Sequence, residues 1–492
     1  MTASTQNRPC ASKLARRRSG YRPRLAASSN GGNSLSRPRP FDFLNILRTR
    51  LISTGIALPL AIFVAAALVR STVLYVARQQ LSPDAFLTSC PDTINYVTCA
   101  QGIISGSADQ ERGLFAFGPG YAAWLAGLFW LFGARALPVL LIQILLSSLS
   151  CVLVYGLAIR LTKSRAIAFI AGLLSAAGIT SSVLSCYLLS DTLYVFLFAL
   201  AFYVTLVGIK SESHLCLAVS GFLFGLSVLV RSIGQFWFVG LLVIVGTMLI
   251  RKPEFRQRFR TSRPLASGLA LLFGMFLLVQ VGWMARNRVV HGIWTNAFTS
   301  AGGPATVAAL SLHPTDEWNF RATIDQWNQE YLLNHNVKTM TMEQNYGWLQ
   351  HKAGQTFSAC PGCVIKTYLK FAWTNLNDVD YLHEDLLPAS RSVTNKVQNF
   401  VRSNHLNYLS FELSMIGLGI LLLVKKFRLF IILATLYGYF LAMIGAFPWQ
   451  GSRYFYPGQL AADILTAIVM VFAWKLAANG AVALWEARNK FY

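Results

Sequence analysis

The stretch FAFGPGYAAWLAGLFWLFG, residues 115–133, decides how the chain is threaded through a membrane. It is apolar, but it is short for a crossing and has the helix-breaking sequence Gly118-Pro119-Gly120 near its start. A helix needs about 17–25 apolar residues to cross roughly 30 Å of hydrocarbon. We therefore expect this segment to dip into the membrane or to lie at its surface, where Trp124 and Trp130 are favoured. A full crossing is the alternative.

The composition of the whole chain indicates a membrane protein. Of its 492 residues, 54% are apolar and only 13% are charged, which excludes a soluble domain with an ordinary surface. Because apolar runs of crossing length recur along the chain, we predict an all-α polytopic membrane protein with about ten crossings, or about eleven if residues 115–133 also cross. The predicted crossings are 51–69, 136–160, 165–182, 191–209, 215–231, 235–250, 266–286, 408–425, 427–446 and 456–478.

The positive charges orient these crossings. The net charge is +23, and 11 of the 43 Lys and Arg residues lie in the first 50 residues, beside the single acid Asp42. This pattern predicts a disordered tail on anionic lipid headgroups, and it argues against binding to nucleic acid. The basic loops 160–165, 251–263 and 425–428 are expected on the same, cytoplasmic side. Both termini are then cytoplasmic.

This orientation predicts five parts. They are a basic cytoplasmic tail (1–48), a transmembrane catalytic module (49–286) that includes an outer loop (78–135), a mainly helical polar domain on the outer face (287–405), C-terminal transmembrane helices (406–480) and a cytoplasmic tail (481–492). The aromatic residues of the polar domain, among them Trp318, Trp327, Tyr331 and Trp348, are available to stack on a sugar, although packing within the domain explains them as well.

Several charged residues stand at the outer ends of the predicted crossings. They are Asp92, Asp191, Arg231, Arg286 and Arg453. Acidic residues are scarce, with 20 in the chain, so two of them at span ends on one face point to function. Asp92 lies four residues before Tyr96 in PDTINYVTCAQGI, residues 91–103, which has helical spacing. The simpler alternatives are that Asp191 caps its helix and that each arginine reaches to the interface.

One carboxylate and several guanidiniums suit the transfer of a sugar from a phosphate. An incoming hydroxyl must lose a proton, and the departing phosphate must accept negative charge. Asp92 is placed to take the proton, and Arg forks match phosphate oxygens.

The order of several motifs resembles a known superfamily. These motifs are DTINYVTCAQGIISG, FGPGYAAWLAGLFWLFG, LLSDTLYVFLFALAFY, GFLFGLSVLVR, RNRVVHGIWTNAFTS and SRYFYPGQLAADIL. Their succession resembles the integral-membrane glycosyltransferases of the GT-C superfamily, most of all the bacterial relatives of protein O-mannosyltransferases and of lipid A aminoarabinose transferases. The resemblance covers nearly all of residues 50–480.

The resemblance implies a function and a site. Such an enzyme moves a sugar from a polyprenyl-phosphate donor to a lipid, glycan or protein acceptor at the outer face of the bacterial inner membrane, with inversion. Asp92 matches the catalytic base of the first outer loop, and Asp191 matches the second acid. Arg453 and Tyr454 match the Arg-Tyr pair of the last shared crossing, and Tyr96, Arg231 and Arg286 join them as expected substrate-binding residues. Asp84, in the same loop as Asp92, is the alternative base.

The chain departs from the family pattern in two places. The aminoarabinose branch has a Glu-Lys pair where this chain has Ala116-Phe117, so a lysine grip on the lipid phosphate does not carry over. Ala122 follows Tyr121 where the family usually has proline. The identities of the sugar and the acceptor therefore stay open.

The sequence gives little support for a cofactor. LHED, residues 382–385, has metal-ligand residue types without a supporting partner, so no metal site is predicted, although a divalent cation is compatible with the chemistry. CPGC, residues 360–363, favours a structural disulfide, with free thiols, a redox pair or half a zinc site as alternatives. The rival functions are a transporter or flippase, against which the lack of an internal repeat argues, and a subunit with this fold but no chemistry.

Overall fold

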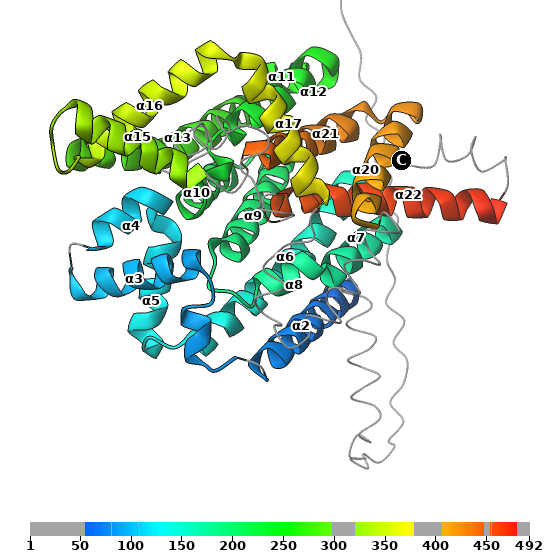
Figure 1. Cartoon of the computed structure of the whole chain (residues 1–492). Coiled ribbons are helices and arrows are strands. Elements are labelled where there is room, and N and C mark those ends of the chain that lie inside the picture. The colour runs from blue at the N-terminus through cyan, green and yellow to red at the C-terminus, as the bar shows by residue number, and fades with distance from the viewer. Residues whose placement is uncertain are drawn as a thin grey trace, which may run out of the picture. The chain divides into compact units, whose positions relative to one another are not determined.

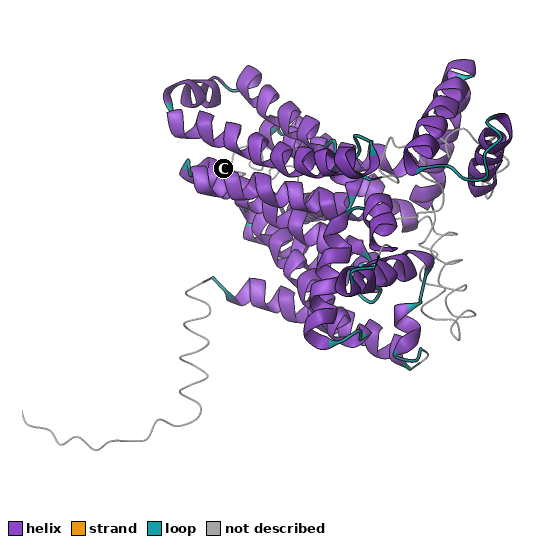
Figure 2. Cartoon of the chain, turned by 90° about the vertical axis from the view of Figure 1, so that its left-hand side faces the viewer, coloured by secondary structure: helices purple, strands orange, loops and turns teal. Residues whose placement is uncertain are grey.

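The structure is a computed structural model that describes residues 55–79, 81–107, 109–297, 320–377, 406–446, 453 and 455–479. All regular elements in these ranges are helical, as predicted (Figures 1 and 2). Six helical segments are long and apolar enough to cross a membrane: α2 (Ala57–Arg78), α6 (Ala136–Thr162), α9 (Ser190–Ser211), Ser232–Arg251 with α11 (Trp237–Arg251), α13 (Arg263–His291) and Tyr456–Ala478 with α22 (Gln459–Asn479). Five shorter apolar helices are α5 (Pro119–Phe132), α7 (Arg165–Ala177), α10 (His214–Val230), α20 (Leu406–Leu423) and α21 (Phe427–Met443). The count of ten or eleven crossings stays a prediction.

The first predicted span was wrong at its end. Residues 51–69 were expected to form the first crossing. The structure instead continues α2 to Arg78 and buries Arg70 completely. A guanidinium tolerates such burial only when its N–H groups are hydrogen-bonded.

Arg70 meets this requirement by joining α2 to three other helices. Its Nε donates to Ser147 of α6, and its Nη2 donates to Ser181 of α8 (Ile179–Leu184). Its Nη1 donates to the backbone oxygen of Ala176 in α7. The distances from these three Arg70 nitrogens to their acceptors are 2.6, 2.9 and 3.1 Å. Arg70 therefore stabilises the packing of α2 on α6, α7 and α8.

Replacing Arg70 by leucine should destabilise the protein strongly. The change leaves buried hydroxyl and carbonyl groups without their donor, which costs on the order of 3 kcal/mol. Thermal unfolding of the purified protein in detergent should show this as a lower midpoint. Arg78→Leu is the matched control, because Arg78 lies in the same helix with an exposed side chain. An equal effect of the two substitutions would contradict the role of Arg70.

The segment 115–133 is broken where its sequence predicted. Helix α4 (Asp109–Phe117) ends before Gly118, whose φ of +87° suits glycine, and α5 begins at Pro119. A Cβ on Gly120 would lie 2.6 Å from the backbone nitrogen of Val230, so the start of α5 packs directly on the end of α10. The 14 residues of α5 extend about 21 Å, less than the hydrocarbon thickness of roughly 30 Å. A surface or re-entrant position therefore stays our prediction.

The described part of the predicted polar domain is helical. It consists of α15 (Phe320–Asn334), α16 (Met342–Ala359) and α17 (Pro361–Asn377). Trp348 Nε1 donates to the backbone oxygen of Trp327, and the ring of Tyr331 lies edge-on to Trp348 at 5.4 Å. These aromatic residues thus hold α15 and α16 together, while Trp318 lies outside the described residues. Cys360 and Cys363 form the favoured disulfide at the start of α17.

Candidate active site

Asp92 stands in the first turn of helix α3 (Pro91–Ser105). Proline at the first helical position and an acid in the first turn both favour a helix start, because Pro91 needs no N–H there and Asp92 complements the helix dipole. Gly106, with a φ of 70°, ends the helix in the left-handed conformation. The helical spacing predicted for residues 91–103 is confirmed.

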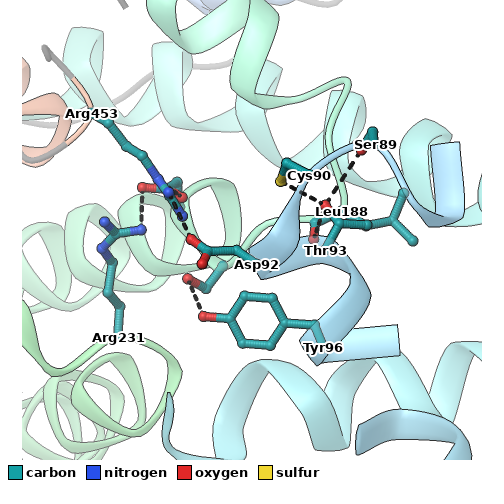
Figure 3. Close-up of polar contacts among 10 residues, drawn as sticks. Ser89, Cys90, Asp92, Thr93, Tyr96, Leu188, Arg231 and Arg453 are labelled. Atoms are coloured by element: carbon teal, nitrogen blue, oxygen red, sulfur yellow. Dashed lines mark hydrogen bonds and ion pairs between the residues drawn. The ribbon is translucent and has the colours of Figure 1, made fainter. Parts of the chain in front are cut away.

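Asp92 belongs to a cluster of two acids and two arginines, which we call the acid–arginine cluster: Asp92, Asp191, Arg231 and Arg453 (Figure 3). Arg453 Nη1 donates to Asp92 Oδ2, and Arg453 Nε donates to Asp191 Oδ2, both at 2.9 Å. Arg231 Nη1 donates to the other oxygen of Asp191 at 2.5 Å. Arg453 therefore bridges the two carboxylates.

Two members of the cluster are buried and two are partly exposed. The side chains of Asp191 and Arg453 are 2% and 3% exposed, and that of Arg231 is 12% exposed. Asp92 is 37% exposed. Two negative and two positive formal charges balance, which offsets the cost of burying them. Asp92 is thus the carboxylate of the cluster that a molecule from solution can reach.

Asp191 is held as an ion-pair partner and not as a helix cap. It lies in the first turn of α9, whose N-cap residue is Leu189, and no side-chain cap bond is made there. The backbone just before it is fixed from α3, because Thr93 Oγ1 donates to the oxygen of Leu188 at 3.4 Å (Figure 3).

Tyr96 lies one helical turn after Asp92 and faces the second acid. Its hydroxyl donates to Ser190 Oγ at 3.1 Å, next to Asp191 in the chain. Burial, and then the negative charge of Asp92, raise the pKa of Tyr96 to about 12. The hydroxyl therefore stays protonated at neutral pH and links α3 to α9.

Gln143 was missed by sequence reasoning, although it holds the segment that leads to Asp191. This amide is fully buried in α6. Its Nε2 donates to the backbone oxygens of Tyr187 at 2.5 Å and Ser185 at 3.3 Å, and its Oε1 accepts from Tyr121 at 2.8 Å. A lone amide in an apolar helix is the signal that was available.

Gln143→Leu should lower the catalytic rate expected of this site by roughly tenfold, because it removes hydrogen bonds worth about 1 kcal/mol each from the connection before Asp191. Turnover per folded protein in detergent measures the effect. Gln280→Leu is the control, because Gln280 is a buried amide of another apolar helix whose described partner is Asn296. Normal turnover in Gln143→Leu would show that the connection keeps its place without it.

Arg286 lies in a different set of contacts. Its Nη1 approaches Asn287 Oδ1 at 3.2 Å and His291 Nε2 at 3.3 Å, and its guanidinium lies 4.9 Å from the centre of the Trp283 ring. These contacts all lie within α13. The ring of His291 in turn lies 4.7 Å from that of Phe115 in α4. The contacts described for Arg286 are thus with the end of α13, which lies beside the predicted outer loop (78–135).

The remaining predicted residues have separate outcomes. Tyr454 and residues 382–385 lie outside the described residues. Asp84 is exposed in the short helix η1 (Asp84–Leu87), away from the ion pairs described for the cluster. Among the residues that the structure describes, no three His, Cys, Asp or Glu side chains gather as metal ligands would.

Comparison with solved structures finds oligosaccharyltransferase and ArnT structures of low sequence identity. The oligosaccharyltransferase of Archaeoglobus fulgidus in the apo form has 13% identity and a TM-score of 0.48, over 87% of this chain and 52% of that chain. The same archaeal enzyme, AglB, in complex with an inhibitory peptide and a dolichol-phosphate has 14% identity and a TM-score of 0.46, over 87% and 54%. ArnT from Cupriavidus metallidurans bound to undecaprenyl phosphate has 15% identity and a TM-score of 0.33, over 84% and 78%. The chain spans about half the length of the oligosaccharyltransferase. No curated protein sequence matches it.

A family model matches the middle of the chain. Residues 118–283 match the family described as dolichyl-phosphate-mannose-protein mannosyltransferase. The matched segment begins at Gly118 and includes Asp191 and Arg231, whereas Asp92 and Arg453 flank it in the chain. The match confirms the resemblance predicted from the motifs: the chain is similar to membrane glycosyltransferases related to the protein O-mannosyltransferases.

Proposed function

We propose that this protein transfers a sugar from a polyprenyl-phosphate donor to an acceptor hydroxyl, with inversion, on the side of the membrane where Asp92 lies. The observation that carries the proposal is the partly exposed carboxylate of Asp92, which Arg453 joins to the buried Asp191. The family match supports the reaction class. The sugar and the acceptor, whether lipid, glycan or protein, stay open.

In this proposal Asp92 acts as the general base. The acceptor hydroxyl gives its proton to the Asp92 carboxylate while its oxygen bonds to the anomeric carbon. The bond from that carbon to the phosphate oxygen breaks, and its electron pair leaves with the polyprenyl phosphate. Attack from the face opposite the leaving group inverts the anomeric carbon. No covalent sugar–enzyme intermediate is required.

Arg453 can couple donor binding to the release of the Asp92 carboxylate. Its Nη1 bonds to Asp92 Oδ2. A donor phosphate that takes over this Arg453 nitrogen would free the Asp92 carboxylate to accept the proton of the hydroxyl. Arg231 would keep Asp191 paired during the exchange. The sequence analysis assigned Arg231 and Arg453 to the donor phosphate alone. Here Arg453 would bind first Asp92 and then the phosphate.

The donor class is tested with purified protein in lipid vesicles. Polyprenyl-phosphate carrying mannose, glucose or aminoarabinose is supplied with lipid, glycan and peptide acceptors, and release of free polyprenyl phosphate is measured. We expect release with at least one lipid-linked sugar. Use of a soluble nucleotide sugar instead would refute the donor class. Movement of intact donor across the bilayer without cleavage would favour the flippase alternative.

Labelling of single introduced cysteines tests the membrane side. We propose a multi-pass protein of the bacterial inner membrane with a cytoplasmic amino terminus, since the basic loops favour that orientation. Positions near Lys163 and Lys425 should react only from the cytoplasm, and positions near Asp84 and residue 340 only from outside. Labelling of residue 340 from the cytoplasm would place the site on the opposite face.

A further inference from the structure

Helix α17 has two faces of different character. One face is buried and contains Val364, Thr367, Phe371 and Asn375. The opposite face exposes three large apolar side chains at intervals of four residues. Ile365 is 56% exposed, Leu369 is 59% exposed and Trp373 is 64% exposed. We call these three residues the α17 stripe.

The buried face of α17 is attached to one end of α21. Asn375 Nδ2 donates to the backbone oxygen of Ile444 at 2.7 Å, and Tyr368 donates to the backbone oxygen of Ala442. A Cβ on Gly445 would lie 2.7 Å from the Tyr368 ring, so the two segments are in close contact. Figure 1 shows α17 running across the direction of α21 and α22.

In the orientation predicted from the basic loops, the end of α21 that α17 contacts stands at the edge of the hydrocarbon. The 17 residues of α21 extend about 26 Å, most of the roughly 30 Å of a bilayer core. The other end carries the basic sequence Lys425-Lys426-Phe427-Arg428, which favours the cytoplasmic surface. The Ala442–Ile444 end, and with it α17, therefore lies at the opposite membrane–water boundary.

We propose that α17 lies along this boundary and that the α17 stripe binds membrane lipid. A stripe of Ile, Leu and Trp on a helix that crosses the direction of the spanning helices fits the interface between headgroups and acyl chains, where Trp is enriched. Lys366 is exposed beside the stripe, where it can meet lipid phosphates. Helix α20, which contacts α17, also exposes the apolar side chains of Leu409 and Ile416.

Asn375 fixes Ile444 at the start of η4 (Ile444–Ala446), so lipid that holds α17 would also steady this end of α21. This inference concerns lipid contact and does not depend on the proposed reaction.

Quenching of tryptophan fluorescence by brominated lipid tests whether the α17 stripe binds lipid. The full-length protein and Trp373→Phe are placed in vesicles of phosphatidylcholine with 10% phosphatidylglycerol, with or without bromine on the acyl chains of the phosphatidylcholine. The difference spectrum of the two proteins isolates Trp373 among 12 tryptophans. We expect brominated lipid to reduce that difference by roughly half or more, because an interfacial residue lies at the acyl boundary.

Trp348→Phe is the matched control, because Trp348 lies in the α15–α16 pair and bonds to the backbone of Trp327. Its difference spectrum should not change with bromine. If the Trp373 signal is also insensitive to bromine, the proposal that the α17 stripe binds lipid is wrong. Quenching by water-soluble iodide would then mean that the stripe lies in water, and no quenching by iodide would mean that protein covers it.

Discussion

Asp92→Asn should reduce sugar transfer by roughly 100-fold or more, the low end of what general acid–base catalysis contributes. The substitution removes the carboxylate that would accept the hydroxyl proton and nearly preserves the shape of the side chain. The fold should persist, because Asp92 is the exposed member of the acid–arginine cluster and Asp191 keeps both of its arginine partners. Donor affinity should change little or rise, since Arg453 loses a competing carboxylate. Initial rates and donor binding are measured on the same preparation.

Asp84→Asn provides the control for this result. Asp84 lies in the same loop, but its side chain is exposed outside the described ion pairs. It should therefore keep normal transfer. Near-normal turnover of Asp92→Asn combined with a loss in Asp84→Asn or Asp191→Asn would move the role of base to the other acid.

The helices were predictable because apolar runs with charged ends fix them locally. The span predicted at 136–160 is α6, Ala136–Thr162, and the span predicted at 191–209 is α9, Ser190–Ser211. The first span failed at Arg70 for a nonlocal reason. Two of the acceptors that make its burial possible, Ser147 and Ser181, lie 77 and 111 residues further along the chain.

The four members of the acid–arginine cluster were predictable from the sequence, but their contacts were not. Scarce acids and arginines at span ends indicated Asp92, Asp191, Arg231 and Arg453. The ion pairs of Arg453 join residues 361 and 262 positions apart, and no local pattern encodes such a pairing. Gln143 is a related case, since its partners near Asp191 are backbone carbonyls that any sequence would supply.

Arg453→Ala should weaken donor binding by about 1.5–3 kcal/mol, the scale of a charge-assisted hydrogen bond, which corresponds to roughly 10- to 150-fold. Transfer should fall further than binding, because the departing phosphate loses a cation and the buried Asp191 keeps only Arg231. Isothermal titration with a polyprenyl-phosphate sugar and initial rates at saturating donor separate the two losses.

Arg453→Lys tests whether transfer needs the two separate hydrogen bonds of Arg453 to the carboxylates or only its positive charge. Lysine keeps the positive charge but has one ammonium in place of a planar fork, so it cannot reproduce the separate Nε and Nη1 bonds to Asp191 and Asp92. If Arg453 must hold Asp191 through Nε while its Nη1 passes from Asp92 to the phosphate, Arg453→Lys should recover much of the donor affinity and little of the transfer rate. Recovery of both would mean that charge alone suffices. Recovery of neither donor affinity nor transfer rate would mean that the phosphate needs the whole planar guanidinium of Arg453. The proposed exchange of one Arg453 nitrogen between Asp92 and the donor phosphate would then be wrong.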